Sequence, residues 1–445
     1  MNAFWVTVYN WFVIPVFAVG IRIGGLVNGK IRRGLAGRRD LFVRLRRDMH
    51  ALEQGRRIWF HSSSMGEFEQ AKPIIAALKQ RHSNVRIIAS FFSPSGFDHA
   101  RNYRFADVTT YIPLDSAANA RKFIDLVKPD AAVIVRYDVW PNHIWELARR
   151  GIPTFLANAT MRADSSRLSF PLRSFHKVLY ERLTSILTVS RDDVENFRQF
   201  NLNGVTILPV GETRYDQVLQ RSVDARAKHL IPDSVTRRKK VIVAGSTWPE
   251  DEDVLLPAFK KILQYDPNVL LVLVPHEPTE NALEGIERRL AFRTSSIRFS
   301  DLIDYAGEQI IIVDSIGILM ALYQYADVAF VGGSFRQNVH NVLEPAVYGI
   351  PVMYGPRHTN SQEAVELARR EGASIVHDQQ DMYRMMRSFL REPKLCEAAG
   401  KASLELVREH AGATERFLKH LEPAVWLPEP GTHRRGKSGP KKTLT

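Results

Sequence analysis

Short apolar runs alternate with helical stretches between residues 57 and 190. The runs have the length and the β-branched or aromatic content of buried strands, and the stretches between them, such as SAANARKFIDLVKP, repeat their apolar residues at helical spacing. This rhythm predicts a doubly wound, mostly parallel α/β sheet. The predicted strands are RIWF (57–60), VRIIASFF (85–92), DAAVIV (130–135), IPTFLAN (152–158) and SILTVS (185–190).

The pattern breaks near Gly211 and then starts again. The stretch that follows is polar and contains a proline, which is typical of a crossover or linker. The fold class that we predict is therefore α/β, with two Rossmann-like domains facing a cleft, and a length of 445 residues suits two cores better than one. The second series of strands is KVIVAGS (240–246), NVLLVLVPHEP (268–278), QIIIVDS (309–315), DVAFVGGS (327–334) and IPVMYGP (350–356).

The division that we predict has four parts. Residues 1–30 form a membrane anchor with its basic flank, residues 31–215 form the N-terminal domain, and residues 216–425 form the C-terminal domain. Residues 426–445 form a basic tail of low complexity that we expect to be disordered.

The amino terminus is apolar over a length that suits a membrane. Residues 2–21 carry no charged side chain, and about 20 residues suffice for a helix to cross a hydrocarbon core of roughly 30 Å. Two tryptophans and a tyrosine in this segment favour the membrane interface. No small-residue cleavage site follows, so we predict an anchor and not a removed signal peptide. A helix that is buried, or that lies in the membrane plane, is the alternative, and Asn10 and Pro15 favour it over a clean span.

The net charge of +13 is concentrated in two segments. Residues 22–57 hold eleven Lys or Arg against three acidic residues, and residues 433–445 hold five and no acid, so the charges balance elsewhere. A balanced core argues against nucleic acid as a partner. By the positive-inside rule, the basic residues predict that the bulk of the chain lies in the cytoplasm, held beside anionic inner-leaflet lipid. The single Cys396 excludes an intrachain disulfide and argues against a zinc site built from cysteines.

In open α/β sheets ligands bind beyond the carboxyl ends of the strands, so the residues that follow each predicted strand are the candidates. In VAGSTWPEDED, the residues Gly245, Ser246 and Thr247 separate a strand from an acidic helix start. Small residues there let backbone N–H groups approach an anion at the helix N-terminus. The spacing of a P-loop is absent, and an ordinary N-cap is the alternative explanation.

The segment FVGGSFRQNVHNVLEPAVYGIPVMYGP is the strongest such element. A strand ends at Gly333 and Ser334, a polar loop follows, and we expect a helix that begins with His340 and Asn341 and carries Glu344. His340 and Glu344 then lie on one face of the helix, whose start suits a phosphate and whose carboxylate suits a ribose diol. A purely structural cap is one alternative. A metal site is another, although no third ligand is evident.

Seven landmarks in chain order resemble one family. They are HSSSMGE, YDVWPN, LANATMRADSSR, PVGETRYD, AGSTWPEDE, GGS followed by HNVLEP, and YGPRHTNSQEA, all behind an apolar N-terminus. The two-domain pattern and these motifs resemble the GT-B glycosyltransferases, and more narrowly the 3-deoxy-D-manno-octulosonic acid (Kdo) transferases of lipopolysaccharide assembly. The likeness runs nearly from end to end, and the order of seven motifs is far more specific than any one of them.

The resemblance implies an inverting glycosyltransferase of the cell inner membrane that moves Kdo from CMP-Kdo to a glucosamine hydroxyl of the lipid A precursor, lipid IVA. It implies no cofactor and no metal, and it assigns the role of general base to Glu67, which matches the glutamate of the family's Ser-x-Gly-Glu motif. The two segments described above then bind the nucleotide. Contacts to the acceptor or the donor sugar are expected from Ser64, Gly66, Asp138, Arg162 and Arg214.

A structural role for Glu67 is open as well. The sequence from Ser64 to Glu67 fits an S-x-x-E capping box, in which the carboxylate bonds to the backbone N–H of the cap residue. The two roles predict opposite results for Glu67→Gln. A capping glutamine still caps and keeps activity, whereas loss of a base abolishes turnover in a folded protein.

The chain departs from the family pattern at two places. Many members have Glu-x-Glu before Trp-Pro-Asn, where this chain has Arg136 and Asp138. Many also have Pro-Arg-His, where this chain has a proline followed by His276 and Glu277. The second change removes an arginine expected near the charged groups of the donor. Possible replacements are Arg162, Arg214 and Arg336, and we expect the Trp-Pro-Asn tripeptide to shape a turn.

The sequence leaves two other functions as alternatives. A GT-B enzyme with another nucleotide-sugar, such as a UDP-sugar transferase or an epimerase, has the same fold, but epimerases normally lack the anchor. A non-catalytic membrane-bound scaffold predicts loss of the carboxylate at position 67 or 344, and both are present.

Overall fold

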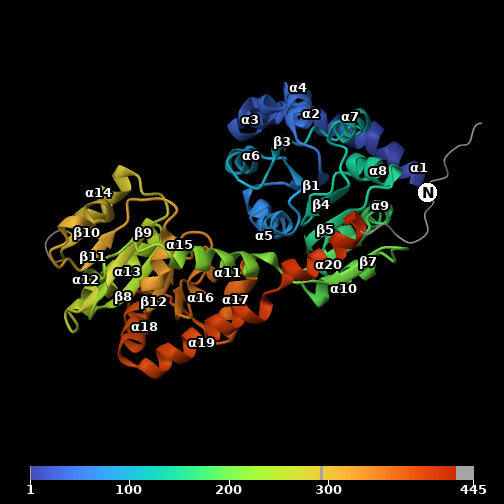
Figure 1. The fold of residues 1–445 in the computed structure, drawn as a ribbon. Coiled ribbons are helices and arrows are strands. Elements are labelled where there is room, and N and C mark those ends of the chain that lie inside the picture. The colour runs from blue at the N-terminus through green and yellow to red at the C-terminus, as the bar shows by residue number, and fades with distance from the viewer. Residues whose placement is uncertain (1, 291–293, 427–445) are drawn as a thin grey trace, which may run out of the picture. The chain divides into compact units, whose positions relative to one another are not determined.

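The computed structural model describes residues 2–290 and 294–426 of the chain. These residues form two compact units, each with its own core (Figure 1). The first unit comprises residues 2–214 and 412–426, and the second comprises residues 215–411.

The first unit is built on a seven-stranded parallel sheet with the strand order β3-β2-β1-β4-β5-β6-β7. Successive residues of a strand point to opposite faces, and Trp59 and Phe60 are both fully buried, so helices cover both faces. The strands are β1 (Arg56–Ser62), β2 (Val85–Phe91), β3 (Val108–Tyr111), β4 (Ala131–Val135), β5 (Thr154–Ala159), β6 (Ser185–Thr188) and β7 (Thr206–Pro209).

An apolar helix opens this unit, with a π-helical turn inside it. It consists of α1 (Asn2–Val8), η1 (Tyr9–Val13) and α2 (Ile14–Val27), and Ala3–Val27 is the one helix in the described part of the chain that is long and apolar enough to cross a membrane. The other helices are α3 (Gly29–Gly37), α4 (Leu41–Ala51), α5 (Met65–Arg81), α6 (Pro94–Ala100), α7 (Ala117–Val127), α8 (Pro141–Arg149), α9 (Leu172–Tyr180), α10 (Arg191–Arg198) and α20 (Ala413–Trp426).

The second unit repeats the architecture, with a parallel sheet in the order β10-β11-β9-β8-β12-β13-β14. The prediction of two Rossmann-like α/β units is therefore confirmed. The strands are β8 (Lys240–Thr247), β9 (Val269–Pro275), β10 (Ser296–Arg298), β11 (Ile310–Ile312), β12 (Val328–Val331), β13 (Val352–Tyr354) and β14 (Ala373–Ile375). The helices are α11 (Thr213–Arg226), α12 (Asp233–Thr236), α13 (Pro249–Leu263), α14 (Glu280–Leu290), α15 (Leu319–Leu322), α16 (Leu343–Ala346), α17 (Gln362–Arg369), α18 (Gln379–Arg391) and α19 (Pro393–His410).

The carboxyl-terminal helix departs from the predicted division. Residues 412–425 were expected in the C-terminal domain, but α20 belongs to the first unit. Its residues Phe417, Leu418 and Leu421 are fully buried in the core that also contains Phe60 and Phe155. The switch between units lies inside α11, after Arg214. The predicted basic tail lies outside the described residues, except for Trp426, which ends α20.

Each sheet has one place where the winding reverses, and this place positions the candidate site. In the first unit β1 lies between β2 and β4, and in the second β8 lies between β9 and β12. The crevices beyond the carboxyl ends of β1 and β4, and of β8 and β12, are thus the topological switch points where such sheets bind ligands.

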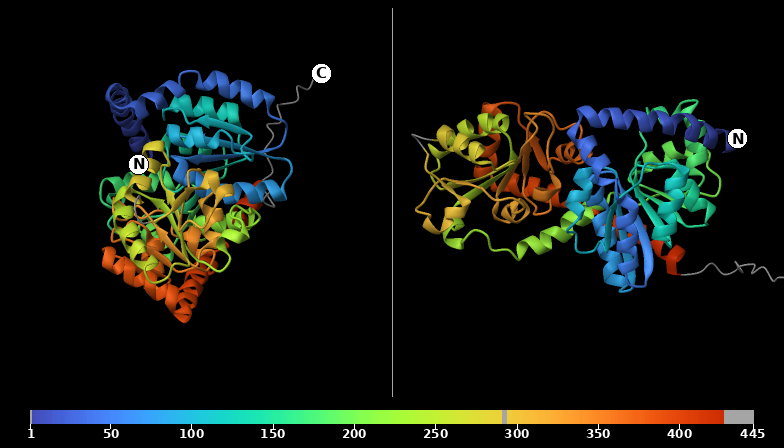
Figure 2. Two further views of the ribbon diagram at one scale, coloured as in Figure 1. Left: turned by 90° about the vertical axis from the view of Figure 1, so that its left-hand side faces the viewer. Right: turned by 90° about the horizontal axis from the view of Figure 1, so that it is seen from above.

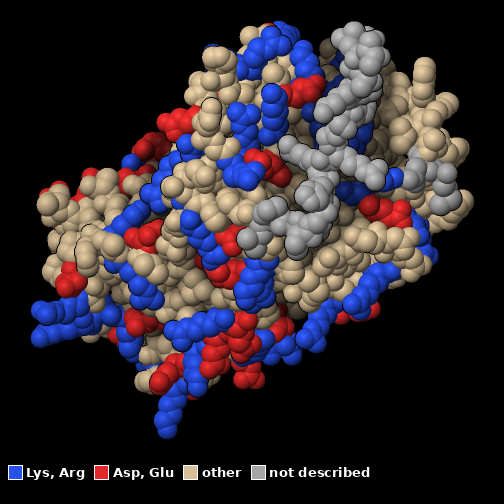
Figure 3. Space-filling model, turned by 45° about the vertical axis from the view of Figure 1, so that its right-hand side comes forward, with Lys and Arg blue, Asp and Glu red and all other residues tan. Residues whose placement is uncertain are grey.

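On the face shown in Figure 3, Lys and Arg are interspersed with Asp and Glu over most of the surface, in keeping with the balanced charge of the chain between its two basic segments.

Candidate active site

Glu67 lies at the switch point of the first sheet. Strand β1 ends at Ser62, and Ser64 is the N-cap of α5, so that Glu67 occupies the third helical position. The backbone N–H of Ser64 donates to Glu67 Oε2 at 3.0 Å, and the Ser64 hydroxyl donates to the same oxygen. The capping box is therefore present. Both bonds use Oε2, and Oε1 accepts no hydrogen bond from any residue in the described part of the chain, so capping leaves one oxygen for chemistry.

Gly66 has no packing reason to be a glycine. A Cβ built at this position would meet nothing nearer than the Ser64 hydroxyl at 3.9 Å. Glycine in a helix costs up to about 1 kcal/mol relative to alanine. The space in front of Gly66, beside Glu67, is open and is suited to the close approach of a ligand.

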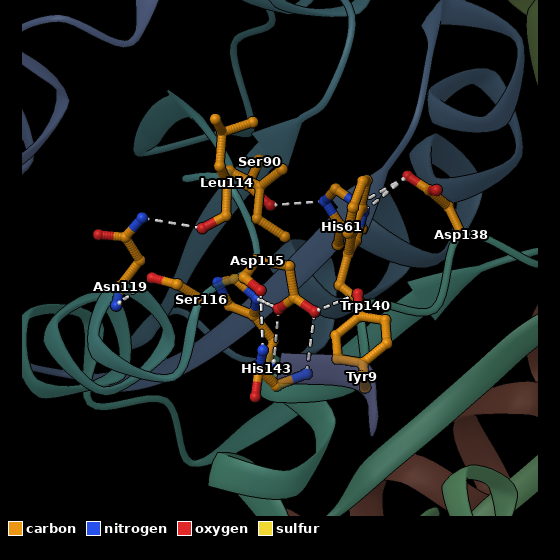
Figure 4. A network of polar contacts seen from close by, with 12 residues as sticks. Tyr9, His61, Ser90, Leu114, Asp115, Ser116, Asn119, Asp138, Trp140 and His143 are labelled. Carbon is orange, nitrogen blue, oxygen red and sulfur yellow. Dashed lines mark hydrogen bonds and ion pairs between the residues drawn. The ribbon is translucent and has the colours of Figure 1, made fainter. Parts of the chain in front are cut away.

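Asp138 follows β4 and is held on one oxygen. Asp138 Oδ2 accepts hydrogen bonds from His61 Nε2 at 2.9 Å and from Trp140 Nε1 at 3.2 Å, and the side chain is 22% exposed (Figure 4). Burial raises the pKa of Asp138, but hydrogen bonds from His61, Trp140 and Ser63 together lower it further, so the net pKa is below its ordinary value. Ser63 directly precedes the N-cap of α5, so Asp138 is bonded to the residue next to the cap that holds Glu67.

His61 lies between Ser90 and Asp138, and its bond to Asp138 fixes which ring nitrogen carries a proton. The indole of Trp59 is only a donor, and its Nε1 bonds to Ser90 Oγ at 2.8 Å. Asp138 is ionised and can only accept, so His61 Nε2 carries a proton and donates it to Asp138, while His61 Nδ1 lies 2.9 Å from Ser90 Oγ (Figure 4). His61 is fully buried and was not recognised from the sequence.

The arginines named from the sequence have other partners in the first unit. Arg136, at φ +65°, donates to Gln70 and to Glu212, and Arg214 also pairs with Glu212. Arg162 pairs with Asp164 at the surface, with 84% of its side chain exposed. Arg162 therefore points to solvent and not to the carboxylates at the switch point.

The second unit presents a stack of rings at its own switch point. Trp248, His276 and His340 follow β8, β9 and β12, and the rings of His276 and His340 are stacked with centroids 4.3 Å apart. The Trp248 and His276 rings are 4.7 Å apart, and the guanidinium of Arg336 lies 3.9 Å above Trp248. Of the three arginines considered as replacements, Arg336 is the one that contacts this stack, through Trp248. A flat, partly exposed, cationic surface of this kind suits a nucleotide.

His340 is neutral in this stack. Trp248 Nε1 donates to His340 Nε2 at 3.1 Å, which requires an unprotonated nitrogen at that position. Burial, followed by the nearby His276, lowers the pKa of His340 to about 4. At neutral pH His340 therefore adds no positive charge to that of Arg336.

The last three residues of β8 pack into the fold more closely than the sequence predicted. A Cβ on Gly245 would lie 2.2 Å from the Tyr323 hydroxyl, so glycine is required for packing. Thr247 is buried and donates to Glu252 at 3.0 Å. Ser246, at φ +56°, is the partly exposed member of this group. The role of these three residues in nucleotide binding stays a prediction.

The loop after β12 is closed by a buried carboxylate. Asp251 accepts hydrogen bonds from the backbone N–H groups of Gly333, at 2.7 Å, and Phe335, at 3.3 Å. Burial raises the pKa of Asp251, and these bonds oppose the shift. Ser334 is fully buried and accepts a bond from the backbone of Gly355. The backbone N–H groups of Gly333 and Phe335 are thus bonded to Asp251 and are not available to a ligand.

The helix expected to begin at His340 is shorter than predicted. Helix α16 begins at Leu343, so His340 lies in the loop before it and does not share a helical face with Glu344. The side-chain oxygen Oδ1 of Asn341 accepts from the backbone N–H of Leu343, and its side-chain Nδ2 donates to Glu344 at 3.2 Å. Glu344 also pairs with Arg221 at 3.4 Å.

Among the described residues, no group of three or more His, Cys, Asp or Glu is arranged to hold a metal ion.

Comparison with known proteins identifies relatives over most of the chain. The family model described as 3-deoxy-D-manno-octulosonic-acid transferase (kdotransferase) matches residues 38–217. The 3-deoxy-D-manno-octulosonic acid transferase of Aquifex aeolicus is 30% identical over 321 residues, which cover 72% of this chain and 81% of that protein. The same enzyme of Haemophilus influenzae is 28% identical over 378 residues, which cover 82% of this chain and 86% of that protein.

Solved structures share the architecture at lower sequence identity. The UDP-GlcNAc 2-epimerase of Neisseria meningitidis aligns with a TM-score of 0.58 and 15% identity, covering 82% of this chain and 99% of that one. This likeness shows the fold alone, with both Rossmann-like units of a GT-B protein. Because a relative of 30% identity is matched over 81% of its length, the chain belongs to the 3-deoxy-D-manno-octulosonic acid transferases, a family of glycosyltransferases.

Proposed function

We propose that the protein is an inverting glycosyltransferase that transfers Kdo from CMP-Kdo to a glucosamine hydroxyl of the lipid A precursor lipid IVA, on the cytoplasmic side of the inner membrane. Membership of the Kdo transferase family supports the sugar and the reaction class. One observation carries the assignment of the base. Glu67 lies at the β1–β4 switch point with one oxygen used by the helix cap and the other free of hydrogen bonds among the described residues.

The chemistry requires such a carboxylate. A sugar hydroxyl is a weak nucleophile, so Glu67 removes its proton while its oxygen bonds to the anomeric carbon of Kdo. The bond from that carbon to the phosphate oxygen of CMP breaks at the same time, and CMP leaves with the electron pair. Proton removal by a positioned base contributes about 10²–10⁴ in rate. Asp138, ionised at neutral pH, is suited to orient the acceptor through its second oxygen.

The departing nucleotide needs stabilisation of its negative charge. We assign this role to Arg336 and to the backbone N–H groups near Ser246 and Asn341, with Trp248 and the stacked rings of His276 and His340 beside the base or the ribose. Fixed dipoles and one guanidinium supply the charge, so the proposed reaction uses no metal and no other cofactor.

The deciding experiment is a transfer assay with Glu67→Gln. Glutamine is also accepted at the third position of a capping box, so the variant keeps the start of α5 and loses the base. The purified full chain in detergent is incubated with CMP-Kdo, lipid IVA and a chelator, and the lipid is read by mass spectrometry. We expect added Kdo mass with the wild type and a loss of about 10²–10⁴ in rate with the variant.

A matched control is Asp193→Asn. Asp193 occupies the same position in the capping box of α10, which begins with Ser190 and follows β6, away from the switch point. This variant is expected to retain turnover. Full activity of Glu67→Gln would show that the carboxylate only caps α5. A mass shift with UDP-N-acetylglucosamine, and none with CMP-Kdo, would replace the proposed donor.

A further inference from the structure

Composition does not decide how the N-terminal helix meets a membrane. The helix from Ala3 to Val27 has 25 residues and a length of about 37 Å, enough to cross a hydrocarbon core of about 30 Å. The same length and composition also suit a helix that lies along a membrane surface. The side-chain contacts of the helix distinguish the two arrangements.

One side of the helix is fixed to the polar interior of the first unit. The Tyr9 hydroxyl donates to Asp115 Oδ2 at 2.8 Å, and Asp115 is fully buried (Figure 4). One residue further, Asn10 Oδ1 accepts from the side chain of Asn142 at 3.0 Å. Asp115 also accepts the backbone N–H groups that begin α8, so the helix is bonded to a carboxylate that the domain itself needs.

These contacts extend along the helix. Trp5 Nε1 donates to Ser174 Oγ of α9 at 3.0 Å, and the ring of Phe17 packs against Trp140 with centroids 5.9 Å apart. The distance along the helix from Trp5 to Phe17 is about 18 Å. Figure 2 shows the dark-blue helix lying lengthwise against this unit. A transverse orientation in the bilayer would carry the polar flank of α8 and α9 into hydrocarbon, where unpaired polar groups each cost several kcal/mol.

The opposite side of the helix is apolar and uncovered. Its exposed residues recur every three or four positions, which places them in one stripe that faces away from the unit. Their exposed fractions run from 56% to 78%, and soluble surfaces rarely leave an apolar stripe of this length open. The stripe consists of Phe12, Val16, Val19, Ile23 and Leu26.

A basic helix is folded back at one end of this stripe. Helix α3 packs closely against α2, because a Cβ on Gly25 would lie 2.9 Å from Leu35. Helix α3 and its flanks carry four exposed cations, which are suited to anionic headgroups beside the apolar stripe and are worth about 1 kcal/mol each there. These cations are Lys30, Arg32, Arg33 and Arg39.

We propose that this helix does not cross the membrane but lies in the plane of a single leaflet that contains anionic phospholipid. Its outward stripe enters the acyl chains, the cations of α3 meet the headgroups, and its inner side stays bonded to the first unit. Trp140, which Phe17 contacts, also donates to Asp138, so one side chain separates the membrane-lying helix from the candidate acceptor site. A lipid-borne acceptor would then reach Asp138 and Glu67 without leaving the leaflet.

Cysteine labelling distinguishes the two orientations and requires no catalytic activity. In the full chain with Cys396→Ser, Ala3→Cys places a thiol at an exposed position near the N-terminus, and Ile303→Cys marks the second unit, where Ile303 is 95% exposed. A membrane-impermeant maleimide is applied to inverted inner-membrane vesicles. We expect label at both positions in inverted vesicles and at neither in intact spheroplasts. Label at position 3 in spheroplasts but not in inverted vesicles would show a spanning helix and overturn the proposal.

Vesicle binding tests the outward stripe. The double variant Val16→Asp with Ile23→Asp changes two stripe residues, and Val223→Asp changes an apolar residue of the second unit that is 64% exposed. With sealed vesicles of phosphatidylethanolamine and phosphatidylglycerol, we expect the wild type and Val223→Asp to sediment with lipid and the double variant to stay in solution. Continued sedimentation of the double variant, or a stable dimer of the wild type that buries the stripe in place of lipid, would overturn the proposal.

Discussion

At the scale of single residues, His61 acts on the site through Asp138 and not through substrate. Asparagine at position 61 places its amide near the Nδ1 position and keeps a partner for Ser90, whereas glutamine reaches the Nε2 position and keeps a donor for Asp138. The Asp138 pKa lies below its ordinary value, since hydrogen bonds stabilise the ionised carboxylate. Loss of the His61 donor therefore raises that pKa, and ionised Asp138 is lost at a higher pH as the solution is acidified.

We therefore expect the acid limb of the kcat/KM profile to move to higher pH in His61→Asn and to stay near the wild-type position in His61→Gln. The measurement is the pH dependence of Kdo transfer from pH 4 to pH 8, after both variants have been shown to fold by circular dichroism. An unchanged acid limb in the asparagine variant would mean that His61 only fills space. A general loss of stability would lower the rate in both variants without moving the limb.

The sequence predicted those site residues whose signal is local. The capping box at Ser64 and Glu67 is visible in four consecutive residues, and the structure contains it. His61 could not be recognised, because its role depends on Ser90 of β2 and on Asp138 in the loop after β4. The ring stack of the second unit was missed for the same reason, since its members follow three different strands. His340 had been named from the sequence, but its contacts with Trp248, just after one predicted strand, and with His276, inside another, could not be.

At the scale of elements, the N-terminal helix should depend on its bond to Asp115. Tyr9→Phe removes one hydroxyl. The buried carboxylate of Asp115 keeps three hydrogen bonds, from the backbone N–H groups of Asn142 and His143 and from the ring of His143. A lost bond to a buried charged group costs about 1–3 kcal/mol. We expect faster proteolysis within residues 1–27 and a lower denaturation midpoint for the first unit. Thr7→Val is the control, because Thr7 bonds to Ala3 inside the same helix, and it should leave both measurements unchanged.

The strands that sequence analysis missed are β3, β7, β10 and β14. All four are sheet edges of three or four residues. An edge strand pairs on one side and is partly open to solvent, so it lacks the continuous apolar run that marks a buried parallel strand. Strand β7, for example, is mostly exposed. The interior strands were predicted because burial on both faces dictates their composition.

At the scale of the whole molecule, the chain leaves the first unit inside α11 and returns to it at Gly412. The return was not predicted, because the apolar spacing of α20 shows that the helix has a buried face but not which core that face joins. Leu421 of α20 is fully buried with Phe60 and Phe155 of the first sheet, whereas Leu406 of α19, fifteen positions earlier, is fully buried with Val352 and Tyr354 of the second.

Leu421→Ala and Leu406→Ala therefore form a matched pair that tests which unit each helix supports. Each substitution leaves a cavity in a packed core and should cost about 2–5 kcal/mol. We expect Leu421→Ala to accelerate amide hydrogen exchange in peptides from β1 to β6 and to leave those from β8 to β13 unchanged, with the reverse pattern for Leu406→Ala. Faster exchange in the second sheet after Leu421→Ala would mean that α20 supports the unit next to it in sequence. In that case, the first core would be complete before residue 412 and its folding would not require the end of the chain.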